Sequence, residues 1–181
     1  MGIMIFRIDD VSSNTDMVEL KKMIALLKDK FDAEILLGVT VFSKYSSDGA
    51  VYPGAPFKDK DLPFFYDVTQ CKTDTIDSLG TVASHGLFHS DHSKLQYDAQ
   101  EMSIVGSCKF LGCNIFIPPF NRFNQTTESV CRINGINLVK LDEGWKSLEY
   151  NDFDDSHSMW YFHPWRFTAE SLKEKVCQLK R

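Results

Sequence analysis

A regular alternation between short apolar segments and longer amphipathic segments is the strongest constraint on the fold. Six apolar segments have the length of strands and lie at 3–8, 33–42, 81–83, 114–117, 137–141 and 159–162. Four further segments carry apolar residues at helical spacing and lie at 15–31, 95–111, 126–133 and 168–179. Strands that alternate with helices predict an α/β fold with mainly parallel strands. The 181 residues contain no repeat and no low-complexity linker, so we expect one domain over 1–181.

A long irregular segment interrupts this pattern between the second and third predicted strands. Residues 43–75 are rich in Gly, Pro, Asp and aromatic side chains. A loop of this length inside a compact domain is usually either functional or disordered. We therefore expect it to shape the substrate site.

Polar residues follow several predicted strands at the point where each strand ends. Asp9 and Asp10 follow the first strand, His85 follows the third, Asp142 the fifth and His163 the last. The carboxyl ends of parallel strands meet on one face of a sheet, where active sites are assembled. These five side chains are therefore expected to form one site.

The spacing of two histidines indicates a metal site. Three residues separate His85 from His89, which lets both imidazoles reach one ion if the chain turns between them. A catalytic site needs a third ligand and keeps one position open, and Asp10 is the best candidate for that ligand. This donor set suits Zn²⁺ first, with Fe, Co, Ni and Mn as alternatives. Asp9 is then placed to act as general base, and His163 as general acid.

Two other interpretations of these residues stay open. His85 and His89 could form a structural zinc site with Cys108 and Cys113 in a non-catalytic binding module. That interpretation gives no role to Asp9, Asp10 or His163. The second alternative keeps the catalytic metal and makes the chain an amidase that acts on a non-sugar C–N bond.

The order of these residues resembles the polysaccharide deacetylase superfamily, the NodB-homology or carbohydrate esterase family 4 type. The matching motifs are Phe6-Arg7-Ile8-Asp9-Asp10, His85-x3-His89, a Pro-Pro-aromatic loop at 118–120, Asp142-x2-Trp145, and His163 after an apolar strand. They follow one another in the family's order over nearly the whole chain. The resemblance implies a distorted, incomplete (β/α) barrel. It also implies metal-dependent hydrolysis of an N-acetyl or O-acetyl group on a sugar.

The resemblance assigns a role to each matching residue. Asp9 matches the catalytic base, and His163 matches the catalytic acid. Asp142 and Trp145 match the motif that orients this histidine and walls the pocket. The metal ligands implied are Asp10, His85 and His89, and the expected substrate pocket consists of Trp145, Pro119, Phe120 and Trp165.

One departure from the family pattern concerns an arginine that orients the base. The third motif of the family places this arginine two residues before a proline, where the chain has Phe116 or Ile117. Arg122, four residues after Pro118, is the first candidate to replace it, and Arg7 is a weaker one. The missing motif arginine also leaves open a deacetylase-like fold without activity.

The composition of the chain limits the classes of molecule that it is expected to bind. The net charge is −5 and the basic residues form no cluster, so we expect no nucleic-acid partner. No apolar run approaches the length of a membrane span, and the first residues lack the pattern of a signal peptide. The five cysteines include no CxxC pair, which is typical of reduced thiols in the cytoplasm. The expected substrate is an acetylated sugar, nucleotide sugar or oligosaccharide, and the sequence indicates no oligomeric state.

Overall fold

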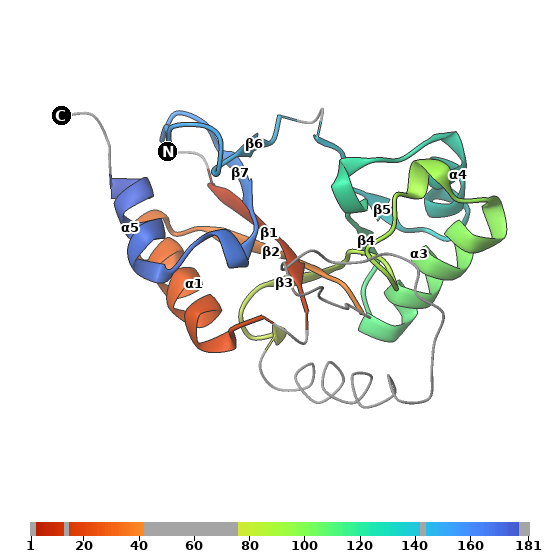
Figure 1. The fold of residues 1–181 in the computed structure, drawn as a ribbon, viewed down its shortest axis with the longest axis horizontal. Helices are drawn as coiled ribbons and strands as arrows, with labels where there is room; N and C mark the ends of the chain where they lie inside the picture. The colour runs from red at the N-terminus through yellow and green to blue at the C-terminus, as the bar shows by residue number, and fades with distance from the viewer. Residues whose placement is uncertain (1–2, 13–14, 42–75, 142–143, 178–181) are drawn as a thin grey trace.

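A single parallel sheet organises the part of the chain that the computed structural model describes, which is 3–12, 15–41, 76–141 and 144–177. Its seven strands lie in the order β5-β4-β3-β2-β1-β7-β6, and every neighbouring pair is parallel. The strands are β1 (Ile5–Val11), β2 (Glu34–Val39), β3 (Thr81–Ser84), β4 (Ile115–Phe116), β5 (Asn137–Leu138), β6 (Lys146–Ser147) and β7 (Met159–Phe162). The sheet curls into a half-barrel (Figure 1). This confirms the predicted α/β class and the incomplete barrel.

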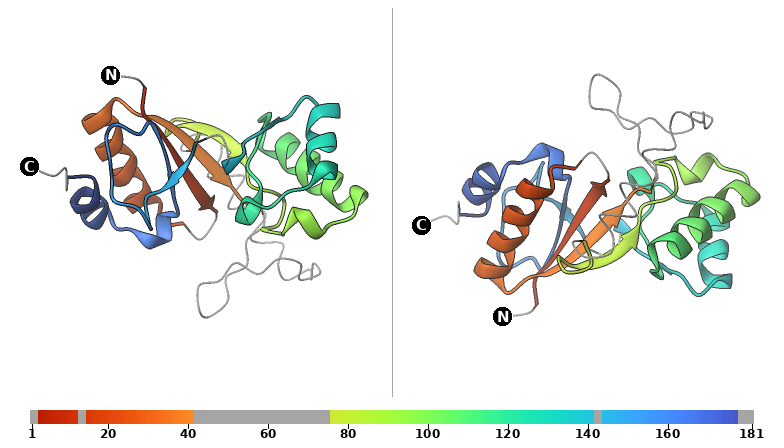
Figure 2. Two further views of the ribbon diagram at one scale, coloured as in Figure 1. Left: turned by 90° about the horizontal axis from the view of Figure 1, so that it is seen from above. Right: turned by 90° about the horizontal axis from the view of Figure 1, so that it is seen from below.

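Two pairs of helices cover the outside of the sheet. Helices α1 (Met17–Phe31) and α5 (Ala169–Cys177) pack beside β1, β2 and β7. Helices α3 (Tyr97–Leu111) and α4 (Gln125–Ile133) pack beside β3, β4 and β5. Figure 2 shows the two pairs at opposite ends of the molecule, with the sheet between them. Three short 3-10 turns, η3 (His92–Lys94), η4 (Pro119–Asn121) and η6 (Pro164–Arg166), follow β3, β4 and β7.

The apolar core is divided in the same way. The larger cluster holds Phe6, Ile8, Leu20, Trp160 and Leu172, all fully buried, and joins the central strands to α1 and α5. A smaller cluster joins α3 and α4 to β4, and its members are Ile104, Cys108, Phe116, Val130, Cys131 and Ile136. Successive side chains of a strand point to opposite faces. Because Phe6 and Ile8 face the helices, the residues between and after them face the inside of the half-barrel.

The ends of the helices have local causes. Asp16 begins α1, since its carboxylate accepts hydrogen bonds from the N–H groups of Val18 and Glu19. Gly112 ends α3 with a φ of 63°, a left-handed conformation that glycine adopts without strain. Asn124 and Thr127 form a reciprocal capping box at the start of α4.

Most predicted elements lie within a few residues of the observed ones, and the differences have physical reasons. β1 continues past Ile8 to Val11 because a bulge carries the pairing over the two aspartates. β6 escaped prediction because its two residues, Lys146 and Ser147, are polar and belong to no apolar run. The segment 43–75 expected to shape the site lies outside the described residues. Among the helices described, none has both the length and the apolar character that crossing a membrane requires.

Candidate metal centre

Two consecutive aspartates reach the site because the backbone of β1 breaks its alternation. The pairing of β1 with β2 shifts register between Ile8 and Val11, and Asp10 has a φ of 60°. Left-handed backbone at a residue other than glycine costs about 1–2 kcal/mol. This bulge brings Asp10 to the same region as Asp9, and both side chains are nearly buried. Strain of this kind clusters at functional sites.

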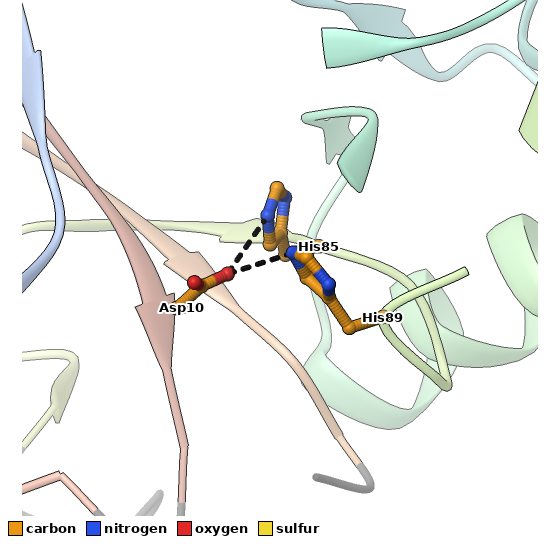
Figure 3. Close-up of side chains that lie close together, drawn as sticks. All are labelled: Asp10, His85 and His89. Carbon is orange, nitrogen blue, oxygen red and sulfur yellow. Dashed lines mark ion pairs between the residues drawn. The ribbon is translucent and has the colours of Figure 1, made fainter. Parts of the chain in front are cut away.

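Asp10, His85 and His89 converge on one point. Each offers a ligand atom within 4.8 Å of the other two, and no other such group of three occurs among the described residues. Oδ1 of Asp10 lies 2.9 Å from Nε2 of His89 and 3.3 Å from Nε2 of His85. Figure 3 shows both imidazoles turned toward this oxygen. Burial raises the pKa of Asp10, but the contacts with the imidazoles of His85 and His89 lower it more, so the carboxyl group is held ionised.

Neighbouring groups fix the two imidazoles. Nδ1 of His85 lies 2.8 Å from the carbonyl oxygen of Ile117. Because a carbonyl oxygen only accepts, Nδ1 carries the proton and donates a hydrogen bond to that oxygen. Nε2 of His85 is therefore available as a ligand atom. The ring of His89 meets the edge of Phe120, with the ring centroids 4.4 Å apart.

Arg7 holds the carboxylate of Asp9, and this corrects the expectation for Arg122. Nη2 of Arg7 lies 2.8 Å from Oδ2 of Asp9 and also donates to Oδ1 of Asn121 at 2.7 Å. The Arg7 side chain is fully buried, between the rings of Trp145 and Tyr161. The weaker of the two sequence candidates thus contacts the expected base.

Arg122 lies elsewhere because of the turn that precedes it. Phe120 and Asn121 have φ values of 57° and 54°, and the Asn121 side chain turns inward to meet Arg7. The next residue, Arg122, is 61% exposed in its side chain and pairs with Asp91 at 3.1 Å. No hydrogen bond or ion pair joins it to Asp9 in the structure.

His163 faces the metal ligands from the other side. Its Nε2 lies 3.8 Å from Oδ2 of Asp10, and its Nδ1 lies 2.5 Å from Oε1 of Glu149. The backbone N–H of His163 donates to the same oxygen at 2.8 Å. Burial lowers the pKa of His163, but the hydrogen bond to Glu149 and the nearby aspartates raise it more. The imidazole is therefore held in its protonated form to higher pH than usual.

Glu149 is a site residue that the sequence did not reveal. Its side chain is 5% exposed, and its contact with His163 spans 14 positions of the sequence. The signal that could have found it is an acid just after a strand, but the two residues of β6 are polar and show no apolar run. Asp142, expected to orient His163, lies outside the described residues.

The residues expected in the substrate pocket lie in three different settings. Trp145 lines a cavity of 580 Å³ with Leu141, Lys146, Ser147, Tyr150, Asn151 and Tyr161. Phe120 and Trp165 are about half exposed, and their rings contact those of His89 and His163 respectively. Nε1 of Trp165 also donates to Oδ2 of Asp10 at 3.3 Å. Pro119 is buried, so it supports the turn at η4.

The cysteines of the alternative zinc site lie apart from the histidines. Cys108 belongs to the smaller apolar cluster and Cys113 packs against it, and both sulfur atoms approach the carbonyl oxygen of Ile115. Among the described residues, only Asp10, His85 and His89 bring three possible ligand atoms within 4.8 Å of one another, so neither thiol joins the two histidines. The geometry therefore contradicts a site built from His85, His89 and these two thiols.

Comparison with known proteins identifies the fold. No protein-family model matches this sequence, and neither does any curated protein. Among solved structures, the family 4 carbohydrate esterase from Streptomyces lividans, in complex with acetate, has a TM-score of 0.65 and 13% identity over 98% of this chain and 86% of its own. Peptidoglycan deacetylase PdaC from Bacillus subtilis has a TM-score of 0.63 and 12% identity over 98% and 82%.

A third neighbour is described as a pseudoenzyme. This CE4 family protein from Bacillus anthracis has a TM-score of 0.63 and 12% identity over 98% of this chain, which spans 60% of the neighbour. A mutant of that protein, described as having restored enzymatic activity, has a TM-score of 0.64 and 14% identity, and this chain covers 62% of it. Sequence identities this low support a shared fold but not a shared activity. The chain has the fold of the carbohydrate esterase family 4 proteins, the family that its motifs resemble.

Proposed function

We propose that the protein is a metal-dependent hydrolase that removes an acetyl group, N-acetyl in the first place, from a sugar or a polysaccharide precursor. One observation carries this proposal: the buried group of Asp10, His85 and His89 lies between an acid held by Arg7 and a histidine held by Glu149. A structural metal site needs no such flanking pair. A hydrolytic site needs both a base and an acid.

The donor set fits a divalent cation. Two imidazole nitrogens and one carboxylate oxygen are the ligands of many catalytic zinc sites, and they leave a coordination position for water or substrate. We propose Zn²⁺ as the metal, with Fe, Co, Ni and Mn as alternatives. Bound there, the cation supplies Lewis-acid polarisation of the acetyl carbonyl.

Asp9 and His163, on the two sides of the proposed metal site, each carry out one of the two proton transfers. Arg7 binds Oδ2 of Asp9, while Oδ1 is buried without a hydrogen-bond partner. Oδ1 is therefore the atom that takes the proton from the attacking water. Glu149 holds Nδ1 of His163, which turns Nε2 toward Asp10. Nε2 then donates a proton to the leaving nitrogen as the C–N bond breaks.

The substrate and the compartment are further parts of the proposal. Phe120 and Trp165 present half-exposed rings beside the ligands, and such rings suit the apolar faces of a sugar. The substrate is then an acetylated monosaccharide, a nucleotide sugar or an oligosaccharide. A cytoplasmic location is a further part of the proposal, and it is supported by the reduced thiols of Cys108, Cys131 and Cys177 among the described residues.

Acetate release from a panel of N-acetyl sugars tests the proposal. The panel contains free, nucleotide-linked and oligomeric N-acetyl sugars together with simple N-acetyl amides, and the enzyme is loaded with one equivalent of Zn²⁺. We expect Asp9→Asn to bind Zn²⁺ normally and to lose at least about 10²-fold in kcat, because general base catalysis contributes 10²–10⁴-fold. Asp29→Asn, on the exposed face of α1, is the matched control and should retain full activity.

Other outcomes separate the alternatives. Full activity in Asp9→Asn overturns the proposed mechanism. Equal turnover of simple amides and N-acetyl sugars indicates the non-sugar amidase. A wild-type protein that binds Zn²⁺ and hydrolyses nothing in the panel indicates a fold without this activity.

A further inference from the structure

The buried face of α3 is polar where it meets the segment that carries the two histidines. Ser103 and Ser107 lie one helical turn apart, and their exposed fractions are 4% and 0%. A buried hydroxyl group costs free energy unless it is hydrogen-bonded. Apolar residues would cover this face at lower cost, so the two serines require an explanation.

Hydroxyl groups bind both N–H groups that follow His85. The N–H of Gly86 donates to Oγ of Ser84 at 3.1 Å, and Ser84 in turn contacts Oγ of Ser107 at 2.5 Å. The N–H of Leu87 donates to Oγ of Ser103 at 3.3 Å. The backbone between His85 and His89 is therefore attached to α3 through side chains.

His92 attaches the far end of the segment to the same serine. Its Nδ1 lies 2.8 Å from the carbonyl oxygen of Ser90, and its Nε2 lies 3.1 Å from Oγ of Ser103. A carbonyl only accepts, so Nδ1 carries the proton and Nε2 of the neutral ring accepts. Ser103 then donates to His92 and accepts from the N–H of Leu87, so its hydroxyl group joins the two ends of the segment. Burial lowers the pKa of His92 to about 4, in keeping with the neutral ring.

Close packing leaves the segment little freedom. Gly86 has a φ of +87°, and a Cβ atom there would lie 2.7 Å from the carbonyl oxygen of Phe88. The same atom would lie 3.3 Å from Cε1 of His92 and from Oγ of Ser103. His85 and His89 thus sit at the two ends of a turn whose inner side is filled by Ser103 and His92.

We propose that Ser103 and His92 are positioning residues that hold His85 and His89 at the spacing one metal ion requires, without touching the ion themselves. This inference rests on the metal centre of the proposed function. Residues that support metal ligands from behind typically change metal affinity by 10–100-fold when they are replaced. Their loss should therefore appear in the Kd for Zn²⁺ and in the order of the turn.

The test compares Ser103→Ala with Thr127→Val. Thr127 is fully buried in α4, and its hydroxyl group donates to Gln100 of α3 at 2.6 Å, away from the histidine turn. Both variants lose a buried hydroxyl group beside α3, and both should lower the Tm of the metal-free protein. Only Ser103→Ala should raise the Kd for Zn²⁺ by 10–100-fold, measured by competition with a chromophoric chelator. Only Ser103→Ala should speed hydrogen exchange in residues 84–92 of the metal-free protein.

A second pair of variants covers the case in which Ser103→Ala does not fold. His92→Gln keeps an acceptor near Ser103, whereas His92→Leu removes every hydrogen bond at similar volume. We expect His92→Leu to weaken Zn²⁺ binding more than His92→Gln. Wild-type affinity in Ser103→Ala, or in His92→Leu if the serine variant does not fold, overturns this inference and leaves the proposed function intact. A wild-type protein that binds no Zn²⁺ overturns the metal centre and this inference with it.

Discussion

Two neighbouring aspartates in β1 can have different tasks because the backbone turns between them. Asp9 keeps the regular orientation of the strand and pairs with Arg7 inside the half-barrel. Asp10 leaves the regular orientation at the bulge and meets His85 and His89. Since the two carboxylates face different partners, the proposed function assigns proton transfer to Asp9 and metal binding to Asp10.

The pairing of Arg7 with Asp9 predicts a catalytic effect for a conservative substitution. Arg7→Lys keeps the positive charge but loses the guanidinium group that lies against the rings of Trp145 and Tyr161 and brings Nη2 to Asp9 and Asn121. We expect kcat for acetate release to fall about 10²-fold, the effect of a misplaced catalytic group, while the Kd for Zn²⁺ is unchanged. Arg122→Lys is the matched control, since this exposed arginine pairs only with Asp91 among the described contacts. Loss of activity in the control and not in Arg7→Lys would restore Arg122 as the orienting residue.

The contact between Glu149 and His163 predicts how the pH profile of kcat/KM changes when Glu149 is replaced. Its carboxylate raises the pKa of His163, so the imidazole stays protonated as the pH rises. In Glu149→Gln this effect is lost, and the alkaline limb of the profile of kcat/KM should move to lower pH. Asp152→Asn, at a carboxylate that is 93% exposed, should leave the profile in place. An alkaline limb that is identical in Glu149→Gln and wild type contradicts the role of His163 as the acid.

The sequence indicated the site residues that lie at strand ends, but not the residues that hold them in place. Asp10, His85 and His89 each follow or interrupt a strand, and the topology brings such positions together. Arg7 was only the second candidate, although it lies two positions from Asp9 on the same face of β1, and its contact with Asn121 spans 114 positions and depends on a left-handed turn. Glu149 was missed because β6 consists of two polar residues, so no apolar run indicates a strand before it. Partners set by register or by an irregular turn have no period that a sequence can show.

At the scale of elements, α3 combines two functions in one helix. Its apolar residues Ile104 and Cys108 belong to the smaller cluster, while Ser103 and Ser107 meet the histidine turn. The helical period predicted that α3 exists and where it ends. It did not predict that serines on its buried face would bind a loop, since short polar residues in a helix usually face solvent.

The junction between α3 and η3 predicts a pH-dependent stability. The ordinary pKa of histidine is 6.5, and burial lowers the pKa of His92 to about 4 in the folded protein. Between these pH values the unfolded chain binds a proton that the folded protein does not bind, so stability falls as the pH falls from about 6.5 to about 4. The loss amounts to about 3 kcal/mol at 1.36 kcal/mol per unit. Above pH 6.5 the effect is absent.

His92→Gln isolates this effect because it removes the titrating group and keeps a polar side chain. Urea unfolding of both proteins in a metal chelator, at intervals from pH 4 to pH 7.5, gives the two free energies. We expect the difference between wild type and His92→Gln to change across pH 4 to 6.5 and to stay constant above that range. A constant difference over the whole range shows that His92 titrates alike in both states.

At the scale of the molecule, the metal ligands lie where the two halves of the sheet meet. Asp10 belongs to β1, which packs on the larger apolar cluster with α1 and α5. His85 and His89 follow β3, beside α3 and the smaller cluster. The alternation of strands and helices predicted the parallel sheet, but the strand order depends on contacts between distant segments. A cation at this point would join the two halves of the half-barrel.

This position predicts that metal binding stabilises the whole fold. A ligand that binds only the folded protein adds about 2.7 kcal/mol at a free concentration of 100 times its Kd. For a chain of this size, each kcal/mol raises the Tm by about 2–4 °C, so saturation with Zn²⁺ should raise the Tm by about 5–10 °C. Calorimetry with Zn²⁺ and with a chelator measures the shift. In Asp10→Ala the shift should vanish, whereas Asp152→Ala should retain it, because Asp152 is an exposed carboxylate that contacts only Lys175 among the described ion pairs. An equal shift in Asp10→Ala and wild type would place the stabilising cation outside the group of Asp10, His85 and His89.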